Sequence, residues 1–393
     1  MPGVVSPDRT GQNPGGRLRI LYYAPQLTVG GMENQICYLA TGLSDRFEPL
    51  VWCSGPWGPV GDRLQGAGIA VHRLYLSPKR PWTFVRAVKL LRRLKLDVFH
   101  SMGHGAHWMD VIAARCAGVP VCIVSRHNIR HWDPQQRIRA SERLRNKFCD
   151  YVVAVGTAVA ERCQQVEHIA PDHMRVIANG VLVPDAVGRV SALRDKLGIG
   201  SAEFVLGNVA NLKTVKDQAS LIKAFGIMAK YSSQVRLLIC GEGELRSELE
   251  KMADSLGLRS RVIFLGNRPD PEEVYRSIDL YVQSSLAEGA PTAILEAMAY
   301  ALPVVATNAG GTSDLVIHET TGLLVPPANP EALASGMLRL FQDPDLRARF
   351  ATAGRRRVES HFAVQGMVQA YETLYLNLIA KFLGTANNVA TVN

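Results

Sequence analysis

The fold of this chain is decided by a stretch in its second half, residues 284–311, which reads SSLAEGAPTAILEAMAYALPVVATNAGG. Pro291 suits the first position of a helix, because the N–H that proline lacks has no partner there. Residues 292–299 are mostly good helix formers, and residues 303–307 form a short apolar run that favours a buried parallel strand. The stretch therefore predicts a loop, a helix, a strand and a final glycine turn.

Two glutamates lie at the start of this helix and inside it. Glu288 precedes the helix and Glu296 follows eight residues later, so a helix continuous over both would separate them by about 12 Å along its axis. The free N–H groups and partial positive charge of a helix N-terminus suit an anion or a sugar hydroxyl. Taken singly, each glutamate can equally be an ordinary helix residue, and only their combination with the glycine turns points to a binding site.

This combination resembles the donor-site signature of the retaining family-four glycosyltransferases of GT-B fold. That signature is a glutamate, seven residues, a second glutamate, a Pro-Val-Val strand and a Gly-Gly turn. The resemblance implies an α/β protein with two Rossmann-like, doubly wound parallel-sheet domains that face a central cleft, and a C-terminal helix that crosses back. It also implies that Glu296 holds the ribose hydroxyls of a nucleotide sugar. Glu288 would hold the donor sugar together with the backbone of Gly289, Ala290, Pro291 and Thr292.

The length and composition agree with two globular domains. A chain of 393 residues with 47% apolar and 20% charged residues is too long for one ordinary core and too apolar to be disordered. We expect an N-terminal, acceptor-side domain at 17–184, completed by a returning helix at 365–383, and a C-terminal, nucleotide-sugar-binding domain at 190–362. No uncharged apolar run is long enough to span a membrane. The seven cysteines lack metal-ligand spacing and indicate reduced thiols in a cytoplasmic protein.

The positive charge is confined to the first half of the chain. Residues 1–185 contain 23 Lys and Arg and 14 Asp and Glu, a net charge of +9, whereas the remainder, with 21 of each, is neutral. This asymmetry points to an anionic partner, which could be a membrane surface, a phosphorylated acceptor or a nucleic acid. No recognised nucleic-acid motif accompanies the charge, so we expect no nucleic-acid partner.

A predicted helix at 83–96 carries part of this charge on one side. Its basic residues there are Arg86, Lys89, Arg92 and Arg93, and its apolar residues fall on the opposite side. The helix can pack on the sheet with a solvated basic face, or it can lie against anionic lipid with about 1 kcal/mol of attraction per basic residue. Both interpretations stay open.

The first half begins with a predicted strand at 18–23, a loop with Gly30-Gly31 and a helix at 33–43, which is the opening of a nucleotide-binding unit. The resemblance implies that the Gly30-Gly31 backbone approaches the diphosphate or the acceptor, because residues without Cβ allow this; a plain tight turn is the alternative. His127 follows a buried strand at the position where the family places a functional histidine on the acceptor side, although a structural histidine is also compatible with the sequence.

The second half supplies the remaining donor-side residues. Residues 208–216 read NVANLKTVK, where the family has Gly-Arg-Leu and then a lysine. Lys216 matches the family lysine that meets the donor diphosphate, whereas Asn211 replaces the usual arginine, and Lys213 could supply the missing cation. Gly243 lies in another nucleotide-side turn, and Arg268 lies where family members hold the base.

No metal or cofactor is expected. Five histidines lie close together between residues 100 and 131, and their spacing fits no compact zinc site. They are His100, His104, His107, His127 and His131. Asp343-Pro344-Asp345 mimics an Asp-x-Asp metal motif, but Asp343 is well placed as a helix N-cap. Ala301 stands where the family often has glycine after the helix, and we expect it in a left-handed cap at a cost of about 1 kcal/mol.

The resemblance implies a retaining, metal-independent hexosyltransferase. It would move a hexose-type sugar from a nucleotide diphosphate to a glycan or lipid-linked acceptor in cell-surface polysaccharide synthesis, in the cytoplasm and peripherally at the inner membrane face. Lys216, with Asn211 and Lys213, would offset charge on the leaving diphosphate. Front-face transfer is expected in place of a covalent intermediate on Glu288. The alternatives are a nucleotide-sugar epimerase of the same fold and an inactive GT-B scaffold that binds sugar or lipid.

Overall fold

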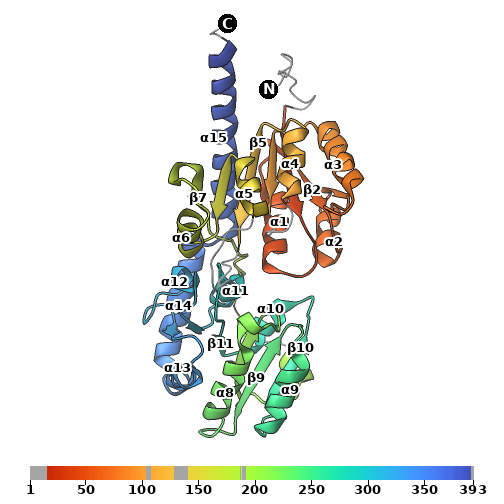
Figure 1. The fold of residues 1–393 in the computed structure, drawn as a ribbon. Coiled ribbons are helices and arrows are strands. Elements are labelled where there is room, and N and C mark those ends of the chain that lie inside the picture. Colours follow the sequence, from red (N-terminus) through yellow and green to blue (C-terminus); the bar gives the residue numbers. More distant parts are fainter. Residues whose placement is uncertain (1–15, 103–107, 128–139, 186, 188–191, 391–393) are drawn as a thin grey trace. The chain divides into compact units, whose positions relative to one another are not determined.

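The computed structural model describes residues 16–102, 108–127, 140–185, 187 and 192–390 (Figure 1). The chain divides into two compact units. The first comprises residues 1–125, 138–153 and 368–393, and the second comprises residues 126–137 and 154–367. Each unit contains a parallel sheet with helices packed against it.

The first sheet has seven strands in the order β3-β2-β1-β4-β5-β6-β7. The strands are β1 (Leu18–Ala24), β2 (Phe47–Cys53), β3 (Ala70–Arg73), β4 (Val98–Ser101), β5 (Val121–Arg126), β6 (Tyr151–Ala154) and β7 (Met174–Val176). The helices of the first unit are α1 (Gly31–Gly42), α2 (Pro59–Gly66), α3 (Pro81–Leu94), α4 (Met109–Cys116) and α5 (Ala140–Lys147). The strand order reverses beside β1, because β2 lies on one side of it and β4 on the other, which is the pattern of a doubly wound sheet.

Helix α3 begins earlier than the sequence predicted. It runs from Pro81 to Leu94, because proline is favoured in the first turn, and it ends where Lys95 adopts a left-handed backbone with φ of 49°. Thr83, Ala87 and Leu91 are buried against the unit. The early start adds Trp82 to the helix, on the side that faces away from the core.

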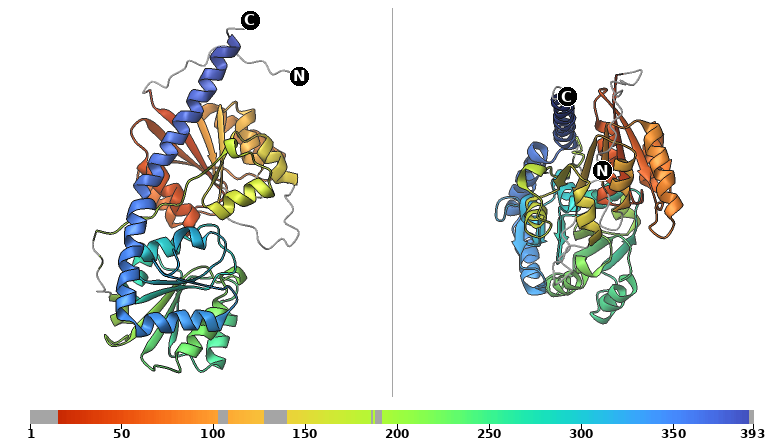
Figure 2. Two further views of the ribbon diagram at one scale, coloured as in Figure 1. Left: turned by 90° about the vertical axis from the view of Figure 1, so that its left-hand side faces the viewer. Right: turned by 45° about the horizontal axis from the view of Figure 1, so that its top comes forward.

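The C-terminal helix α15 (Val364–Ala390) extends beyond the predicted end at residue 383, and from Val368 onward it belongs to the first unit (Figure 2). Its Tyr375 hydroxyl lies 2.7 Å from Nδ1 of His100, and Nε2 of His100 lies 2.8 Å from the Ser125 hydroxyl. Burial lowers the pKa of His100 to about 3, so the ring is neutral. This buried network attaches α15 to strands β4 and β5.

The second sheet has six strands in the order β10-β9-β8-β11-β12-β13. The strands are β8 (Phe204–Val209), β9 (Val235–Cys240), β10 (Val262–Gly266), β11 (Leu280–Gln283), β12 (Val304–Thr307) and β13 (Leu323–Val325). The helices of the second unit are α6 (Thr157–Gln165), α7 (Ala192–Lys196), α8 (Gln218–Met228), α9 (Arg246–Ser255), α10 (Pro271–Ser277), α11 (Thr292–Ala299), α12 (Thr312–Leu315), α13 (Pro330–Gln342) and α14 (Pro344–His361). Two short 3₁₀ helices, Pro171–His173 and Thr214–Lys216, complete it.

Both faces of the second sheet are buried. Along β9, Leu237 and Ile239 enter the core under α8 and α13, whereas Leu238 and Cys240 enter the core under α11 and α14. Successive strand residues point to opposite faces, so a strand that is covered on both faces must be apolar at every position. The continuous apolar runs in the sequence have this origin.

The stretch that decides the fold forms a loop, helix α11, strand β12 and a glycine turn. Ala301 has φ of 50° and is the predicted left-handed cap, and the Asp343 side chain accepts a hydrogen bond from the Leu346 N–H at 2.8 Å as the predicted N-cap of α14. The prediction that Pro291 is the first helical residue is wrong. Pro291 is the extended residue before the helix, which begins at Thr292. The segment between Glu288 and Thr292 is therefore not helical, and the axial spacing calculated for one continuous helix does not apply.

Candidate active site

The candidate site lies at the carboxyl edge of the second sheet, where the strand order reverses. Strands β8 and β11 are neighbours there, and the segments that follow them carry Lys216 and Glu288. Ligands of open α/β sheets bind at such a reversal, because the loops of adjacent strands diverge from it. The topology therefore explains why residues 72 positions apart in the chain come into contact.

Glu288 is the centre of this site and is 8% exposed. Three donors surround one of its oxygens: Nζ of Lys216, Nε2 of Gln283 and the hydroxyl of Ser285, each 2.6 Å from Oε1. The Lys216 side chain is 24% exposed, so this ion pair is half-buried. A carboxylate that accepts three hydrogen bonds, one of them from a cation, is fixed in position.

The backbone around Glu288 is also held closely. The N–H of Gly311 donates to the Glu288 carbonyl at 3.0 Å. A Cβ on Gly311 would lie 1.9 Å from the carbonyl oxygen of Gly289, although the φ of Gly311, −76°, is ordinary for any residue. Gly311 is thus required by the close approach of two loops. Only its neighbour Gly310, with φ of 54°, is in the left-handed region.

Glu296 lies in α11 and has its own partner. The Tyr275 hydroxyl donates to Oε2 of Glu296 at 2.6 Å. Burial raises the pKa of Glu296 to about 7, the hydrogen bond from Tyr275 opposes this shift, and the negative charge of Glu272 adds to it. The carboxyl is therefore partly protonated near neutral pH and able both to donate and to accept hydrogen bonds.

The other predicted donor residues surround this centre less closely. Asn211 and Lys213 are exposed on the segment after β8, and Nη2 of Arg268 forms an ion pair of 2.8 Å with Asp270 after β10. Gly243 follows β9, where a Cβ would lie 2.2 Å from the Leu212 carbonyl oxygen. Gly243 is therefore required by the packing of its own loop.

Gly30 and Gly31 belong to the first unit, at the start of α1. A Cβ on Gly30 would lie 2.2 Å from Oε2 of Glu33, a buried carboxylate that accepts a hydrogen bond from Gln26 at 2.7 Å. Glu33 is a site residue that was not predicted from the sequence. Glu33 lies three residues after the N-cap, which is the acidic position of a capping box. This spacing is the feature of the sequence that could have predicted it.

His127 is buried directly after β5 and belongs to the second unit. The histidines at 104, 107 and 131 lie outside the described residues. Within the described part of the chain, no group of three or more His, Cys, Asp or Glu side chains is arranged to hold a metal ion. In the same part, no helix has the length and apolar character needed to cross a membrane.

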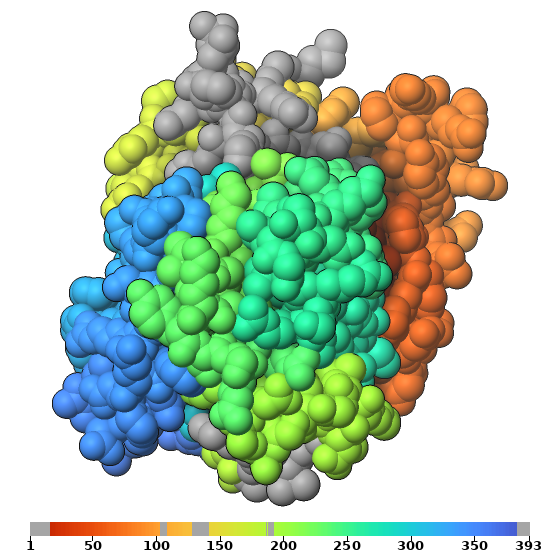
Figure 3. All heavy atoms as spheres, turned by 90° about the horizontal axis from the view of Figure 1, so that it is seen from below, coloured from red at the N-terminus to blue at the C-terminus, as the bar shows by residue number. Residues whose placement is uncertain are grey.

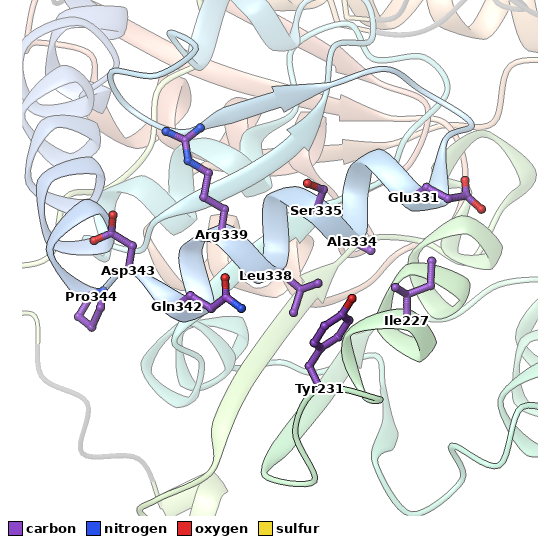
Figure 4. A pocket seen from close by; sticks show the side chains of 10 residues that line it. All are labelled: Ile227, Tyr231, Glu331, Ala334, Ser335, Leu338, Arg339, Gln342, Asp343 and Pro344. Carbon is purple, nitrogen blue, oxygen red and sulfur yellow. The ribbon is translucent and has the colours of Figure 1, made fainter.

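A separate groove of about 740 Å³ lies elsewhere on the second unit, between α8 and α13 (Figure 4). Figure 3 shows this side of the unit, with α13 in blue and α8 in green. Ile227, Tyr231 and Leu338 provide its apolar lining, and Glu331 and Arg339 lie among its charged residues. It is at the C-terminal end of α8, which leads into the start of β9, and no predicted site residue lines it.

Two doubly wound parallel sheets, with a polar site at the carboxyl edge of the second, define the GT-B class of proteins. In agreement, the crystal structure of Anabaena Alr3699/HepE in complex with UDP and glucose superposes with a TM-score of 0.81 at 26% identity, over 91% of this chain and 99% of that one.

The sequence comparisons identify the family. Residues 190–357 match the family model "Glycosyl transferases group 1" and residues 29–182 match "Glycosyltransferase Family 4", so that together the two models cover most of the chain. The chain belongs to this family of glycosyltransferases.

Two relatives illustrate the family. The UDP-Gal:alpha-D-GlcNAc-diphosphoundecaprenol alpha-1,3-galactosyltransferase of Escherichia coli is 27% identical over 76% of this chain and 79% of that protein. The capsular polysaccharide biosynthesis glycosyltransferase CapM of Staphylococcus aureus is 30% identical over 44% of this chain and 46% of that protein. The predicted family and fold are confirmed, whereas the roles given to single residues stay predictions.

Proposed function

We propose that this glycosyltransferase is a retaining, metal-independent hexosyltransferase that takes its sugar from a nucleoside diphosphate. The observation that carries the proposal is the Lys216–Glu288 ion pair at the carboxyl edge of the second sheet. It combines a cation that can meet a diphosphate with a carboxylate that can meet a sugar. Uracil is the first base to test, because HepE was crystallised with UDP and the E. coli relative is named for UDP-Gal.

In this proposal Lys216 exchanges partners when the donor binds. Its ammonium leaves Glu288 for the diphosphate and offsets the negative charge that builds up as the sugar departs. Lys213 and Asn211 are exposed on the same segment and would supply the further polar contacts. Glu296, which Tyr275 orients, would bind the ribose hydroxyls, and Arg268 would lie at the base.

Retention is proposed to occur by front-face transfer. Glu288 carries its charge in an ion pair and two further hydrogen bonds, which makes it a weak nucleophile. The departing phosphate would instead take the proton of the acceptor hydroxyl, and His127 would lie on the acceptor side. No step in this scheme requires a covalent bond to Glu288.

The acceptor is proposed to be a glycan or a lipid-linked glycan, as in cell-surface polysaccharide synthesis, reached at an anionic membrane surface on the cytoplasmic side. The basic residues of the outer face of α3 are exposed, and two apolar side chains, Trp82 and Val85, lie on the same face and are 57% and 51% exposed. Tryptophan beside basic residues suits the boundary between lipid head groups and acyl chains. This combination favours a lipid surface over a solvated helix face.

The test is a panel of nucleotide sugars, first for binding and then for transfer to candidate acceptors, with the anomeric configuration of the product read by NMR and with chelator added. Retained configuration and full activity in chelator are expected. Conversion of the sugar in the absence of an acceptor would favour the epimerase, and binding without turnover would favour the scaffold. An inverted product would refute the front-face scheme.

A further inference from the structure

The residues that hold Glu288 form a chain of hydrogen bonds that begins deep in the second unit. The hydroxyl of Tyr281, a fully buried residue, donates to Oε1 of Gln283 at 3.0 Å. Nε2 of Gln283 then donates to Oε1 of Glu288 at 2.6 Å and lies 3.3 Å from the Ser285 hydroxyl. Ser285 itself donates to Glu288. Among the residues that the structure describes, every side-chain hydrogen bond to Glu288 ends on Oε1, and none ends on Oε2.

The third partner of Oε1 is Lys216. In the proposed function, its ammonium leaves Glu288 for the diphosphate when the donor binds. The side chains of Gln283 and Ser285 are 3% and 1% exposed, so they cannot leave Glu288 to contact the donor. Gln283 is the last residue of β11, and Ser285 follows two residues later. The Thr307 hydroxyl donates to the Ser285 carbonyl at 2.5 Å and so fixes the backbone at this end of the strand. Two neutral donors thus remain on Glu288 after its cation has left.

We propose that Gln283 and Ser285 are positioning residues, which hold the Glu288 carboxylate by Oε1 so that Oε2 faces the donor sugar, and that Tyr281 sets the orientation of the Gln283 amide. The inference rests on the proposed function, since it assigns a task to the same site. It adds three residues that act through Glu288 and do not touch the donor.

The role of Tyr281 follows from the two orientations that an amide can adopt. In the observed one, the Gln283 oxygen faces the tyrosine hydroxyl and its NH₂ group faces Glu288. In the flipped orientation the oxygen would face the carboxylate, and two acceptors would oppose each other without a proton. Burial and the nearby charges of Glu288 and Glu296 raise the pKa of Tyr281 well above its usual range, so the hydroxyl keeps its proton and remains a donor.

The first test separates turnover from binding. Gln283→Met keeps the volume of the side chain but removes its donor. We expect kcat to fall by about 10- to 100-fold, as for the loss of a charge-assisted hydrogen bond, while the affinity for UDP, or for the nucleoside diphosphate that the panel selects, stays within about threefold. Ser285→Ala should behave in the same way, and the matched Ser285→Thr, which keeps a hydroxyl, should recover most of the rate. Thermal melts verify that each variant is folded, and the serine pair decides the test if Gln283→Met is not.

The second test asks whether Tyr281 acts through Gln283. Tyr281→Phe should lower kcat on its own, but the double variant with Gln283→Met should lose no more than Gln283→Met alone. A purely structural tyrosine would add its full cost in the double variant, because independent effects are additive.

The outcomes distinguish the two proposals. A parent protein that binds no nucleoside diphosphate overturns the proposed function and this inference with it. A parent that binds and turns over the donor, with variants that keep kcat within threefold or lose affinity as much as rate, overturns the positioning role alone. Additive losses in the double variant overturn the role of Tyr281.

Discussion

Replacing Glu296 by glutamine should stabilise this protein at high pH and weaken its binding of the donor. The carboxyl has a pKa of about 7 in the folded chain against 4.5 for an ordinary glutamate, because burial disfavours its charge. Each pKa unit corresponds to about 1.4 kcal/mol, so ionised Glu296 costs the folded state about 3 kcal/mol. Glutamine can still accept the hydrogen bond from Tyr275 and carries no charge.

The sign and the pH window follow from proton linkage. Between pH 4.5 and about 7 the unfolded chain has lost the proton of Glu296, whereas the folded chain keeps it. Stability therefore falls as the pH rises through this window and the loss is complete above it. Glu296→Gln should match the parent at pH 4.5 and gain up to about 3 kcal/mol at pH 8, measured as thermal or urea unfolding at both values. A difference between variant and parent that is the same at both pH values would refute the shifted pKa.

The donor provides the second reading of the same variant. Ribose hydroxyls that donate to Glu296 would favour its ionised form, so UDP affinity should increase as the pH rises through 7. The phosphates of UDP also titrate near this range and change its affinity for variant and parent alike. The quantity to follow is therefore the dissociation constant of the variant divided by that of the parent at each pH. We expect Glu296→Gln to bind UDP less well than the parent, by a ratio that grows from pH 6 to pH 8. A ratio that is constant and close to one would refute the prediction that Glu296 binds the ribose hydroxyls.

Three further predictions can be tested independently. Lys216→Ala should lower kcat/KM by about 10- to 150-fold, the cost of one charge-assisted contact, whereas the control Lys213→Ala should cost less; equal losses would mean that Lys213 shares the role. Tyr375→Phe leaves a buried nitrogen of His100 without its partner, so unfolding at pH 7.5 should require about 1–3 kcal/mol less, and an unchanged melting temperature would contradict this. Vesicles with anionic lipid should bind the protein at low salt and release it at high salt, and binding should weaken when the basic α3 face is replaced by glutamine; equal partition onto neutral vesicles would refute the electrostatic attachment. The replaced residues are Arg86, Lys89, Arg92 and Arg93.

Local patterns predicted the architecture because each of them had a direct structural cause. Apolar runs became strands covered on both faces, Asp343 became an N-cap through its side-chain oxygen, and Ala301 adopted the left-handed cap without glycine. Helix boundaries were less predictable. Pro81 and Pro291 are both prolines next to a helix start, yet the first lies inside its helix and the second outside. The sequence contains no local signal that separates these two cases.

The partners of the site residues could not be predicted, because they depend on the order of strands. The signature indicated that Glu288 and Lys216 matter, but not that they contact each other, which follows from β8 and β11 being neighbours. Gln283 and Tyr281 were read only as part of a strand, since nothing local distinguishes a polar strand residue that holds a carboxylate from one that faces solvent.

The ion pair also bears on the missing arginine at Asn211. A lysine that is already paired must give up Glu288 before it can meet a diphosphate, so its net gain on binding is the difference between two charged contacts. With an arginine present, that difference would matter little. With Asn211 in its place, the donor affinity depends on the cost of separating Lys216 from Glu288, while Gln283 and Ser285 keep the carboxylate in position once Lys216 has left. Restoring the cation by Asn211→Arg should therefore raise donor affinity while making kcat less sensitive to Lys216→Ala. An equally severe Lys216→Ala effect in both backgrounds would show that the two cations act independently.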